Sequence, residues 1–518
     1  MFKGQPKGLF ALALANTGER FGYYTMMAIF TLFMQAKFGW SEDEAGSVNA
    51  YFLAAVYFLP LVGGYISDKI GYGRCVQIGI GVMFLGYLCL AIPTSDTNTA
   101  LFTMIGGLTL VSIGTGLFKG NLQVLVGNLY DDPKYSAKRD SAFSLFYMAI
   151  NIGAMFAPSM AKWVTNQYLD QYGMVYDAAN TTPEYLEVLS GGYGLCFGVA
   201  CISLVLSAII YFATRRWFKH ADVTVAQVKS TTDTYIEELT PKQTKDRIVA
   251  LLLVFFVVIF FWMAFHQNGA ALTFFAKKYT NLTVEGPMRF GFNIFSLALV
   301  AVAVYTGFSA FQSKTTKAKS ISAVVTVILL GCAYGLYSMM DNPTMCQPSD
   351  FQQFNPFFVV ALTPFSMVIF DGLAKKGHEV SAPTRIAWGM LVAGLGFGII
   401  TLASTGLTSP MDLGKDQTQS ILSPGWLIST YLTLTFAELL LSPMGISFVS
   451  KVAPPKYKGL MMGGWFVATA IGNYASMLPS KLWNRIPLMY NWAILIALCL
   501  ISAILMFSLL KKLKKMTE

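Results

Sequence analysis

Five ionisable side chains lie inside stretches of sequence that are otherwise apolar for about 20 residues. They are Glu19, Arg20, Lys119, His266 and Glu438. An ionised group at the centre of a bilayer costs at least about 2.5–3.5 kcal/mol on insertion scales, so it needs a protein partner or a water-filled cavity. These groups could transfer protons or bind a charged solute. The alternative is a set of buried ion pairs that only join helices.

The types of these residues indicate the kind of solute. Arg20 and Lys119 are cations that can hold a carboxylate. Glu438, together with the amides of Asn151 and Asn355, can hold an ammonium group. The two sets predict a site for a zwitterion, a small molecule that carries both charges.

The elements that must position these groups are membrane-spanning helices. Of the 518 residues, 55% are hydrophobic and only 12% are charged, against about 25% charged in an ordinary soluble domain. Fourteen apolar runs are each long enough to cross about 30 Å of hydrocarbon. They lie near 9–35, 46–70, 74–93, 100–127, 140–165, 190–215, 247–278, 288–311, 318–340, 352–374, 384–406, 424–448, 460–483 and 489–511. The sequence therefore predicts an all-α integral membrane protein.

The runs fall into two unequal sets. Six lie within residues 1–215, and a hydrophilic, basic stretch at 216–246 follows them. The remaining eight lie within 247–518. We expect an N-terminal six-helix bundle, a cytoplasmic linker and a C-terminal six-helix bundle with an inserted hairpin at about 288–340. Two such bundles are the layout that secondary transporters use to alternate access around a site at the middle of the membrane.

The net charge of +10 is explained by topology. Most of the 37 lysine and arginine residues fall in alternate loops, which are cytoplasmic if both termini are cytoplasmic. This distribution argues against nucleic-acid binding. The loop at 277–290 is an exception, with three basic residues on the external side. The first apolar run is too long for a signal peptide, so it predicts a first spanning helix.

Other functional classes lack the residues that they need. The seven cysteines have no CxxC spacing, and the three histidines are scattered over the chain. Neither a disulfide framework nor a metal site is indicated, and no cofactor is expected. An enzyme would need a motif such as HExxH or GxSxG, and a channel would need a filter-like segment. Neither feature is present in the sequence.

Several motifs together resemble the proton-dependent oligopeptide transporters of the major facilitator superfamily, and bacterial di- and tripeptide carriers in particular. The most specific are ERFGYY at 19–24 and FSLFYMAINIGAM at 143–155. Further matches lie at 63–69, 114–121, 351–356, 438–445 and 463–466. The resemblance runs nearly from end to end. It implies the superfamily fold, with 14 transmembrane helices, in the bacterial inner membrane.

The resemblance also implies a function and a site. It implies symport of di- and tripeptides with protons by alternating access, carried out by a monomer within the lipid bilayer. The implied substrate-binding residues are Arg20, Tyr23, Tyr24, Tyr57, Lys119, Asn151, Trp262, Asn355, Glu438 and Trp465. The implied residues for proton coupling and gating are Glu19, Arg20, Lys119, His266 and Glu438. The alternative is a carrier of another small zwitterion or organic anion, with weaker proton coupling.

The chain departs from the family pattern at three positions near the site. Asn16 replaces the leading Glu of the first-helix motif, and Met27 and His266 replace an Arg and a Glu that ordinarily form an external salt bridge. Losing both charges together avoids an unpaired buried charge. The departure leaves Lys119 and Glu438 as the expected gate pair.

His266 has two interpretations. With a reference pKa of about 6.5, a histidine titrates in the working range and could take over a share of the proton coupling. The alternative is a neutral side chain that fills the vacated Glu position.

Overall fold

The computed structural model describes the chain apart from residues 1–3, 41, 95, 177–179, 181, 224–238, 270, 347, 379, 414–418, 477–481, 484 and 518. Fourteen helices of 18 or more residues run through the described part, one for each predicted apolar run. The first half contains α1 (Lys7–Phe38), α2 (Glu42–Ile70), α3 (Tyr72–Ala91), α4 (Thr97–Asn128), α6 (Arg139–Gln171) and α7 (Pro183–Ala213). The second half contains α9 (Pro241–Phe265), α11 (Ile294–Gln312), α12 (Thr316–Ser338), α13 (Phe354–Lys375), α14 (Ala382–Ala403), α15 (Gly425–Val452), α16 (Lys458–Ala475) and α18 (Leu488–Thr517).

The predicted fold class is confirmed. Twelve of the described helices are long and apolar enough to cross a membrane. The other two, α1 and α16, are also long enough but carry more polar residues and glycine, including Glu19 and Arg20 in α1. Polar residues in these two helices are expected where a helix lines a site within the membrane instead of facing lipid.

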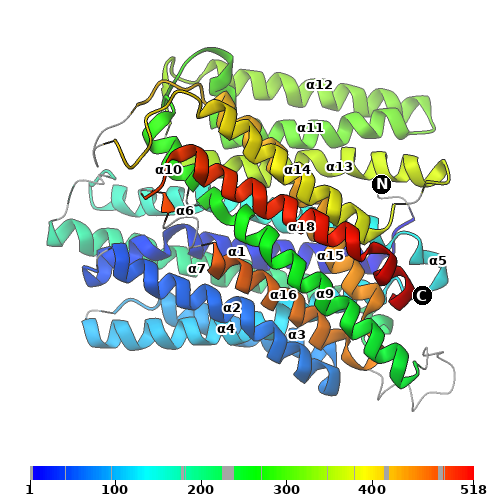
Figure 1. The fold of residues 1–518 in the computed structure, drawn as a ribbon. Coiled ribbons are helices and arrows are strands. Elements are labelled where there is room, and N and C mark those ends of the chain that lie inside the picture. Colours follow the sequence, from blue (N-terminus) through cyan, green and yellow to red (C-terminus); the bar gives the residue numbers. More distant parts are fainter. Residues whose placement is uncertain are drawn as a thin grey trace.

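Each half packs mainly on itself, and a few helices join the halves. In the first half α1 packs on α6 and α7, and α4 packs on α2 and α3. In the second half α14 packs on α15 and α18, and α9 packs on α16 and α18. Contacts between the halves run from α2 to α16 and from α6 to α13 and α15. Both termini lie at the same end of the molecule (Figure 1). We call this end the basic end because the helix ends and turns there carry Lys69, Arg74, Lys134 and Lys458.

The inserted hairpin consists of α11 and α12. It lies at the edge of the molecule beside α13, with α12 outermost (Figure 1). Ala333 is the one fully buried residue among the described residues of α12, so nearly the whole surface of this helix faces outward. The inner helix reaches both halves, because the Tyr305 hydroxyl donates to the carbonyl of Val360 in α13 at 2.7 Å and contacts the sulfur of Met148 in α6.

The predicted helix at 247–278 is wrong in one respect, since it is not continuous. The α-helix α9 ends at Phe265, a 3-10 turn covers His266–Gly269, and a short helix α10 follows at Ala271–Tyr279. The sequence at this break is Gln-Asn-Gly, and Asn and Gly are poor helix formers. Helix α9 also begins earlier than predicted, at Pro241, because the N-cap residue Thr240 and Gln243 in the first turn form a capping box.

Short elements complete the chain. The predicted linker at 216–246 contains two 3-10 turns, Arg215–Trp217 and Lys219–Ala221, and its centre lies outside the described residues. At the other end of the molecule, strand β1 (Thr283–Val284) pairs antiparallel with β2 (Thr344–Met345). Arg289, one of the exceptional external cations, is buried there. Its guanidinium donates to the carbonyls of Met340 and Asp341, both at 2.8 Å, just beyond α12.

Candidate functional site

The carboxylate of Glu438 joins three helices. It lies in α15, is 5% exposed, and accepts a hydrogen bond from the hydroxyl of Tyr147 in α6. Its other oxygen accepts from the amide of Asn355 in α13 at 2.7 Å, and the same amide also donates to Thr435 at 3.1 Å. An ionised carboxylate can accept about four hydrogen bonds. Glu438 therefore keeps capacity for a further donor, such as an ammonium group.

A second charged group lies on α1. The guanidinium of Arg20 forms two hydrogen bonds with the carboxylate of the preceding residue, Glu19. Both residues are at most 3% exposed, and the guanidinium lies 4.5 Å from the centre of the Tyr23 ring. A paired, aromatic environment of this kind lowers the cost of burying a cation.

The ammonium group of Lys119 forms the third part of the site. It lies 3.9 Å from the ring centre of Tyr57 in α2 and 4.6 Å from that of Phe466 in α16. Among the residues that the structure describes, it has no hydrogen bond or ion pair. The predicted gate pair of Lys119 with Glu438 is thus not formed in this conformation. The carboxylate accepts from Tyr147 and Asn355, and the ammonium group lies against two aromatic rings.

Two tyrosines connect the cationic and anionic groups. Tyr24 and Tyr57 both interact electrostatically with Arg20 and with Glu438. Lys119 in turn interacts electrostatically with Arg20. The structure therefore brings opposite charges from the two halves to one region without pairing them with each other. Lys119 and Glu438 are thus opposite charges without an ion pair among the described residues, whereas Arg20 is paired with Glu19.

Two predicted residues have structural roles in this conformation. The amide of Asn151, predicted to assist Glu438, donates instead to the carbonyl of Tyr147 one turn earlier at 3.0 Å. Tyr23 is 3% exposed and packs against Tyr24 and Phe52. Its neighbour Tyr24 is only partly buried, so Tyr24 is the member of the pair that is more open to a ligand.

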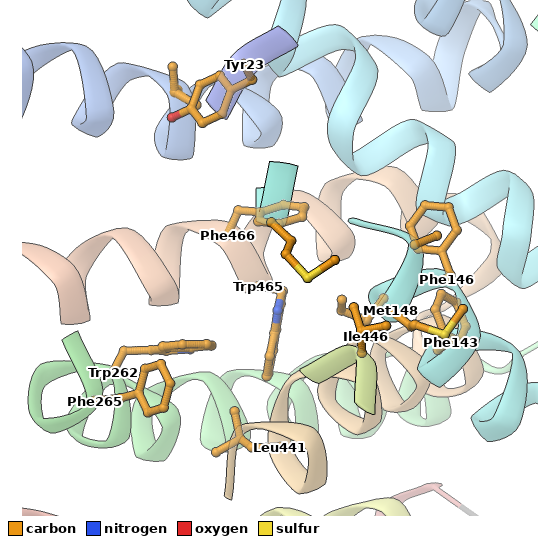
Figure 2. Close-up of a cluster of buried hydrophobic side chains, with 14 of the residues drawn as sticks. Tyr23, Phe143, Phe146, Met148, Trp262, Phe265, Leu441, Ile446, Trp465 and Phe466 are labelled. Carbon is orange, nitrogen blue, oxygen red and sulfur yellow. The ribbon is translucent and has the colours of Figure 1, made fainter. Parts of the chain in front are cut away.

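The predicted pocket tryptophans lie within a cluster of buried hydrophobic side chains (Figure 2). Trp262 is 6% exposed and Trp465 is 2% exposed. A Cβ atom added at Gly445 would lie 2.0 Å from the Trp465 ring, so the absence of a side chain at Gly445 lets this ring pack on α15. Trp262 stacks on His266 with 5.1 Å between the ring centres. Among the residues that the structure describes, neither the Trp262 indole nitrogen nor the Nε2 atom of His266 has a hydrogen-bond partner.

Polar contacts also join the halves at the basic end. The carboxylate of Asp68 in α2 accepts hydrogen bonds from the backbone N–H groups of Gly459 and Leu460, at 2.8 and 3.0 Å. These groups belong to the first turn of α16, where backbone N–H groups lack partners within the helix and the helix dipole favours an anion. One carboxylate of the first half thereby caps a helix of the second half.

An ion-pair cluster lies beside this cap. Asp131, in the turn after α4, pairs with Lys458 at 2.6 Å and with Arg139 at 2.7 Å. Arg139 also donates to the hydroxyl of Ser450 in α15 at 2.8 Å. Partial burial opposes ionisation of Asp131, but the ammonium of Lys458 and the guanidinium of Arg139 outweigh it and lower the pKa of this carboxyl.

Backbone contact between α2 and α16 is unusually close here. A Cβ atom added at Gly64 would lie 2.0 Å from the carbonyl oxygen of Gly459, and one added at Gly463 would lie 2.5 Å from the carbonyl oxygen of Pro60. Glycine at both positions thus permits direct packing of the two helices. The two halves are closed against each other at the basic end.

The sequence interpretation missed several of these residues. Tyr147 lies within the motif at 143–155, and Asp68 lies within the motif at 63–69, so both positions had a signal. Asp131 and Lys458 had none, because they are 327 residues apart and each lies in an ordinary basic or acidic loop. A single sequence does not indicate which loops meet.

The lowered pKa of Asp131 predicts that its ion pairs with Lys458 and Arg139 do not respond to mild acid. A carboxyl with a lowered pKa contributes stability above its ordinary value of 3.8 and loses it only as the pH falls through the lowered value. We expect the carboxyl carbon chemical shift of Asp131, measured by NMR, to be the same at pH 8 and pH 5. In Asp131→Asn we expect amide hydrogen exchange at Gly459 and Leu460 to be about two- to fivefold faster than in the unsubstituted protein at pH 8. A change in the Asp131 chemical shift between pH 8 and pH 5 would contradict this assignment.

Fold and site together define a helical membrane carrier with a charged site between two bundles. A model of the POT family matches residues 74–235 and 332–494. The chain therefore belongs to the POT family.

Relatives and solved structures agree with this membership. Dipeptide and tripeptide permease B of Xenorhabdus bovienii (strain SS-2004) is 27% identical over 493 residues, covering 92% of this chain and 86% of the permease. Dipeptide and tripeptide permease A of Escherichia coli (strain K12) is 25% identical over 494 residues, covering 91% and 84%. The crystal structure of a POT family transporter in complex with 5-aminolevulinic acid has a similar fold, with a TM-score of 0.62, 20% identity, and coverage of 100% of this chain and 98% of the other.

Proposed function

We propose that this protein is a proton-coupled symporter that imports di- and tripeptides by alternating access. The observation that carries the proposal is a pair of opposite charges, Lys119 on the first half and Glu438 on the second, that form no ion pair among the described residues. Arg20 is a further cation on the first half, and its present partner is Glu19. The family and the names of the relatives support a peptide as the solute. The protein is a carrier, and no enzyme activity is proposed.

The cationic and anionic sides of the site determine the orientation of the bound peptide. The carboxyl terminus binds Arg20 and Lys119, and Lys119 has donors to spare because its present neighbours are aromatic rings. The amino terminus binds Glu438, with Asn355 and Asn151 nearby. Tyr24 and Tyr57 line the space between the two sides, and Tyr23, Trp262 and Trp465 support it. Binding both ends of the backbone leaves the side chains to be held by aromatic surfaces, which suits a carrier of many peptides.

The transport cycle follows from the closed contact at the basic end. We propose that the basic end is cytoplasmic, as the distribution of lysine and arginine indicates, with both termini inside and the protein in the bacterial inner membrane. The moving units are residues 1–215 and 247–518, joined by the linker at 216–246. The structure then represents a state closed to the cytoplasm. A single chain contains both halves of the site, so a monomer is sufficient.

Proton coupling is assigned to the ionisable groups of the site. Protonation of Glu438 would release an ammonium group and weaken its bonds to Tyr147 and Asn355. The pair of Glu19 and Arg20 is the second candidate, because a proton on Glu19 would free Arg20 for a carboxylate. His266 is the third candidate, and its Nε2 atom has no hydrogen-bond partner in the described part of the chain.

The contribution of His266 can be tested by one substitution. We expect His266→Gln to retain peptide binding but to flatten the dependence of uptake on external pH between pH 5 and 8, because glutamine does not titrate there. The measurement is the initial rate of dipeptide uptake as a function of pH. Unchanged pH dependence in this variant would assign His266 the role of a neutral filler.

The function itself is tested in proteoliposomes. Labelled dialanine should accumulate against its gradient when an inward proton gradient is imposed, and should only equilibrate without it. Uptake of labelled 5-aminolevulinic acid in the same assay separates the two candidate substrate classes. Accumulation of that zwitterion, with no accumulation of dialanine, would favour a carrier of another small zwitterion. No accumulation of either would contradict the proposal.

A further inference from the structure

A side pocket in the first half shares no lining residue with the charged site. It has a volume of about 350 Å³ and lies at the end of the molecule opposite the basic end. Helices α3 and α7 contact each other near the basic end, where the Tyr211 hydroxyl donates to the carbonyl of Gly73. The pocket lies at the opposite end of the molecule. The last turn of α3 and the start of α4 contribute to its lining, and so do α1, α6 and α7.

The pocket carries one cation and one anion. Lys37, in the last turn of α1, donates to the carbonyl of Thr94 at 2.6 Å, which leaves two of its three N–H groups for other acceptors. Glu187, in the second turn of α7, is exposed and lines the same pocket. In the part of the chain that the structure describes, the two side chains form no ion pair. Two opposite charges thus line one pocket without neutralising each other.

The rest of the lining is apolar and continues onto the outer surface of the protein. Phe33 and Met104 are buried in the pocket wall. A Cβ atom added at Gly194 of α7 would meet no atom within 4 Å, so the pocket is open along this helix. Beyond it, Leu195 and Ile202 expose 48% and 64% of their surface along α7. An apolar surface on a spanning helix faces lipid chains.

We propose that this pocket binds the headgroup of a phospholipid that carries a primary ammonium group, from the leaflet at the end opposite the basic end. Lys37 binds the phosphate and Glu187 binds the ammonium group, while the acyl chains follow the exposed face of α7. The mixture of opposite charges and adjoining apolar surface fits a lipid better than a free solute, because a free solute would not use the apolar face.

The charges predict a definite order of lipid preference. Phosphatidylethanolamine offers a phosphate to Lys37 and three N–H donors to Glu187. Phosphatidylglycerol offers the phosphate but no cation. A charge-assisted hydrogen bond is stronger than a neutral one, so we expect phosphatidylethanolamine to bind about tenfold more tightly than phosphatidylglycerol with the same acyl chains.

Native mass spectrometry of the full-length protein in detergent, titrated with each of these two lipids, tests the proposal. We expect Glu187→Gln to abolish the preference for phosphatidylethanolamine while leaving the binding of phosphatidylglycerol unchanged. We expect Lys37→Gln to weaken the binding of both lipids by about tenfold, because both lipids bind Lys37 through their phosphate. Glu285→Gln, which removes an exposed acid in the other half, is the matched control and should change neither.

Three results would overturn the proposal. Equal binding of the two lipids by the unsubstituted protein would show that Glu187 does not bind the ammonium group of phosphatidylethanolamine. An equal effect of Glu285→Gln would show that net charge, and not this pocket, sets the preference. Binding of phosphoethanolamine as tight as that of phosphatidylethanolamine would show that the lipid chains have no role. Thermal unfolding of Lys37→Gln, measured without lipid, separates a binding defect from a folding defect.

Discussion

Glu438→Gln is expected to abolish proton-driven uptake of dialanine. The substitution keeps the size of the side chain and its bond to Asn355, but it removes the negative charge that the peptide ammonium group would meet. It also removes the ionisable carboxylate that accepts a hydrogen bond from the Tyr147 hydroxyl across the interface between the halves. Removing one partner of a buried, hydrogen-bonded charge pair costs about 2–5 kcal/mol, which corresponds to a loss of about 30-fold or more in transport at low peptide concentration.

Two companion variants make this result interpretable. Lys119→Ala should cause a comparable loss, because it removes the cation that the structure leaves without an ion pair. Glu285→Gln makes the same chemical change at an exposed position and should transport normally. Binding of dialanine, measured by calorimetry, should be lost in both site variants. Normal accumulation in Glu438→Gln would exclude this carboxylate from substrate and proton binding together.

Gly64→Val is expected to stop uptake by a different route, without touching the charged site. A Cβ atom at this position would lie 2.0 Å from the carbonyl oxygen of Gly459, and backbone atoms cannot yield as a flexible side chain can. Overpacking of a close contact typically costs about 1–3 kcal/mol. Here the cost falls only on the conformation in which α2 and α16 touch. The variant should therefore favour the conformation that is open at the basic end.

Hydrogen exchange measures this shift directly. The N–H groups of Gly459 and Leu460 are protected by Asp68 only while the halves are closed, so their exchange should be at least about fivefold faster in Gly64→Val. Gly81→Val, on α3, adds the same side chain where no atom lies within 4 Å of the new Cβ atom. In this variant, hydrogen exchange at Gly459 and Leu460 and the uptake of dialanine should both be normal. Slow exchange in Gly64→Val would mean that the contact between α2 and α16 accommodates the side chain.

The sequence alone was sufficient for the fold class and for the number of long helices. Each predicted apolar run corresponds to a helix, because a span of about 20 apolar residues has few alternatives in a bilayer. The break after Phe265 was not predicted, since hydropathy continues across it and only the poor helix formers Asn268 and Gly269 mark it. The sequence predicted a hairpin at about 288–340, but the position of α11 and α12 beside α13 and their contact with both halves came from the structure.

The sequence also indicated the charged residues of the proposed site, because an ionisable group within an apolar run is easily recognised in a polytopic protein. It could not pair them. Whether Glu438 meets Lys119 or Tyr147 depends on how two halves, separated by hundreds of residues, lie in one conformation. The same holds for Asp131 with Lys458 and for Lys37 with Glu187, whose types are ordinary in surface loops and helix ends. Local hydropathy determines which segments cross the membrane, whereas packing between distant helices decides which charges become partners.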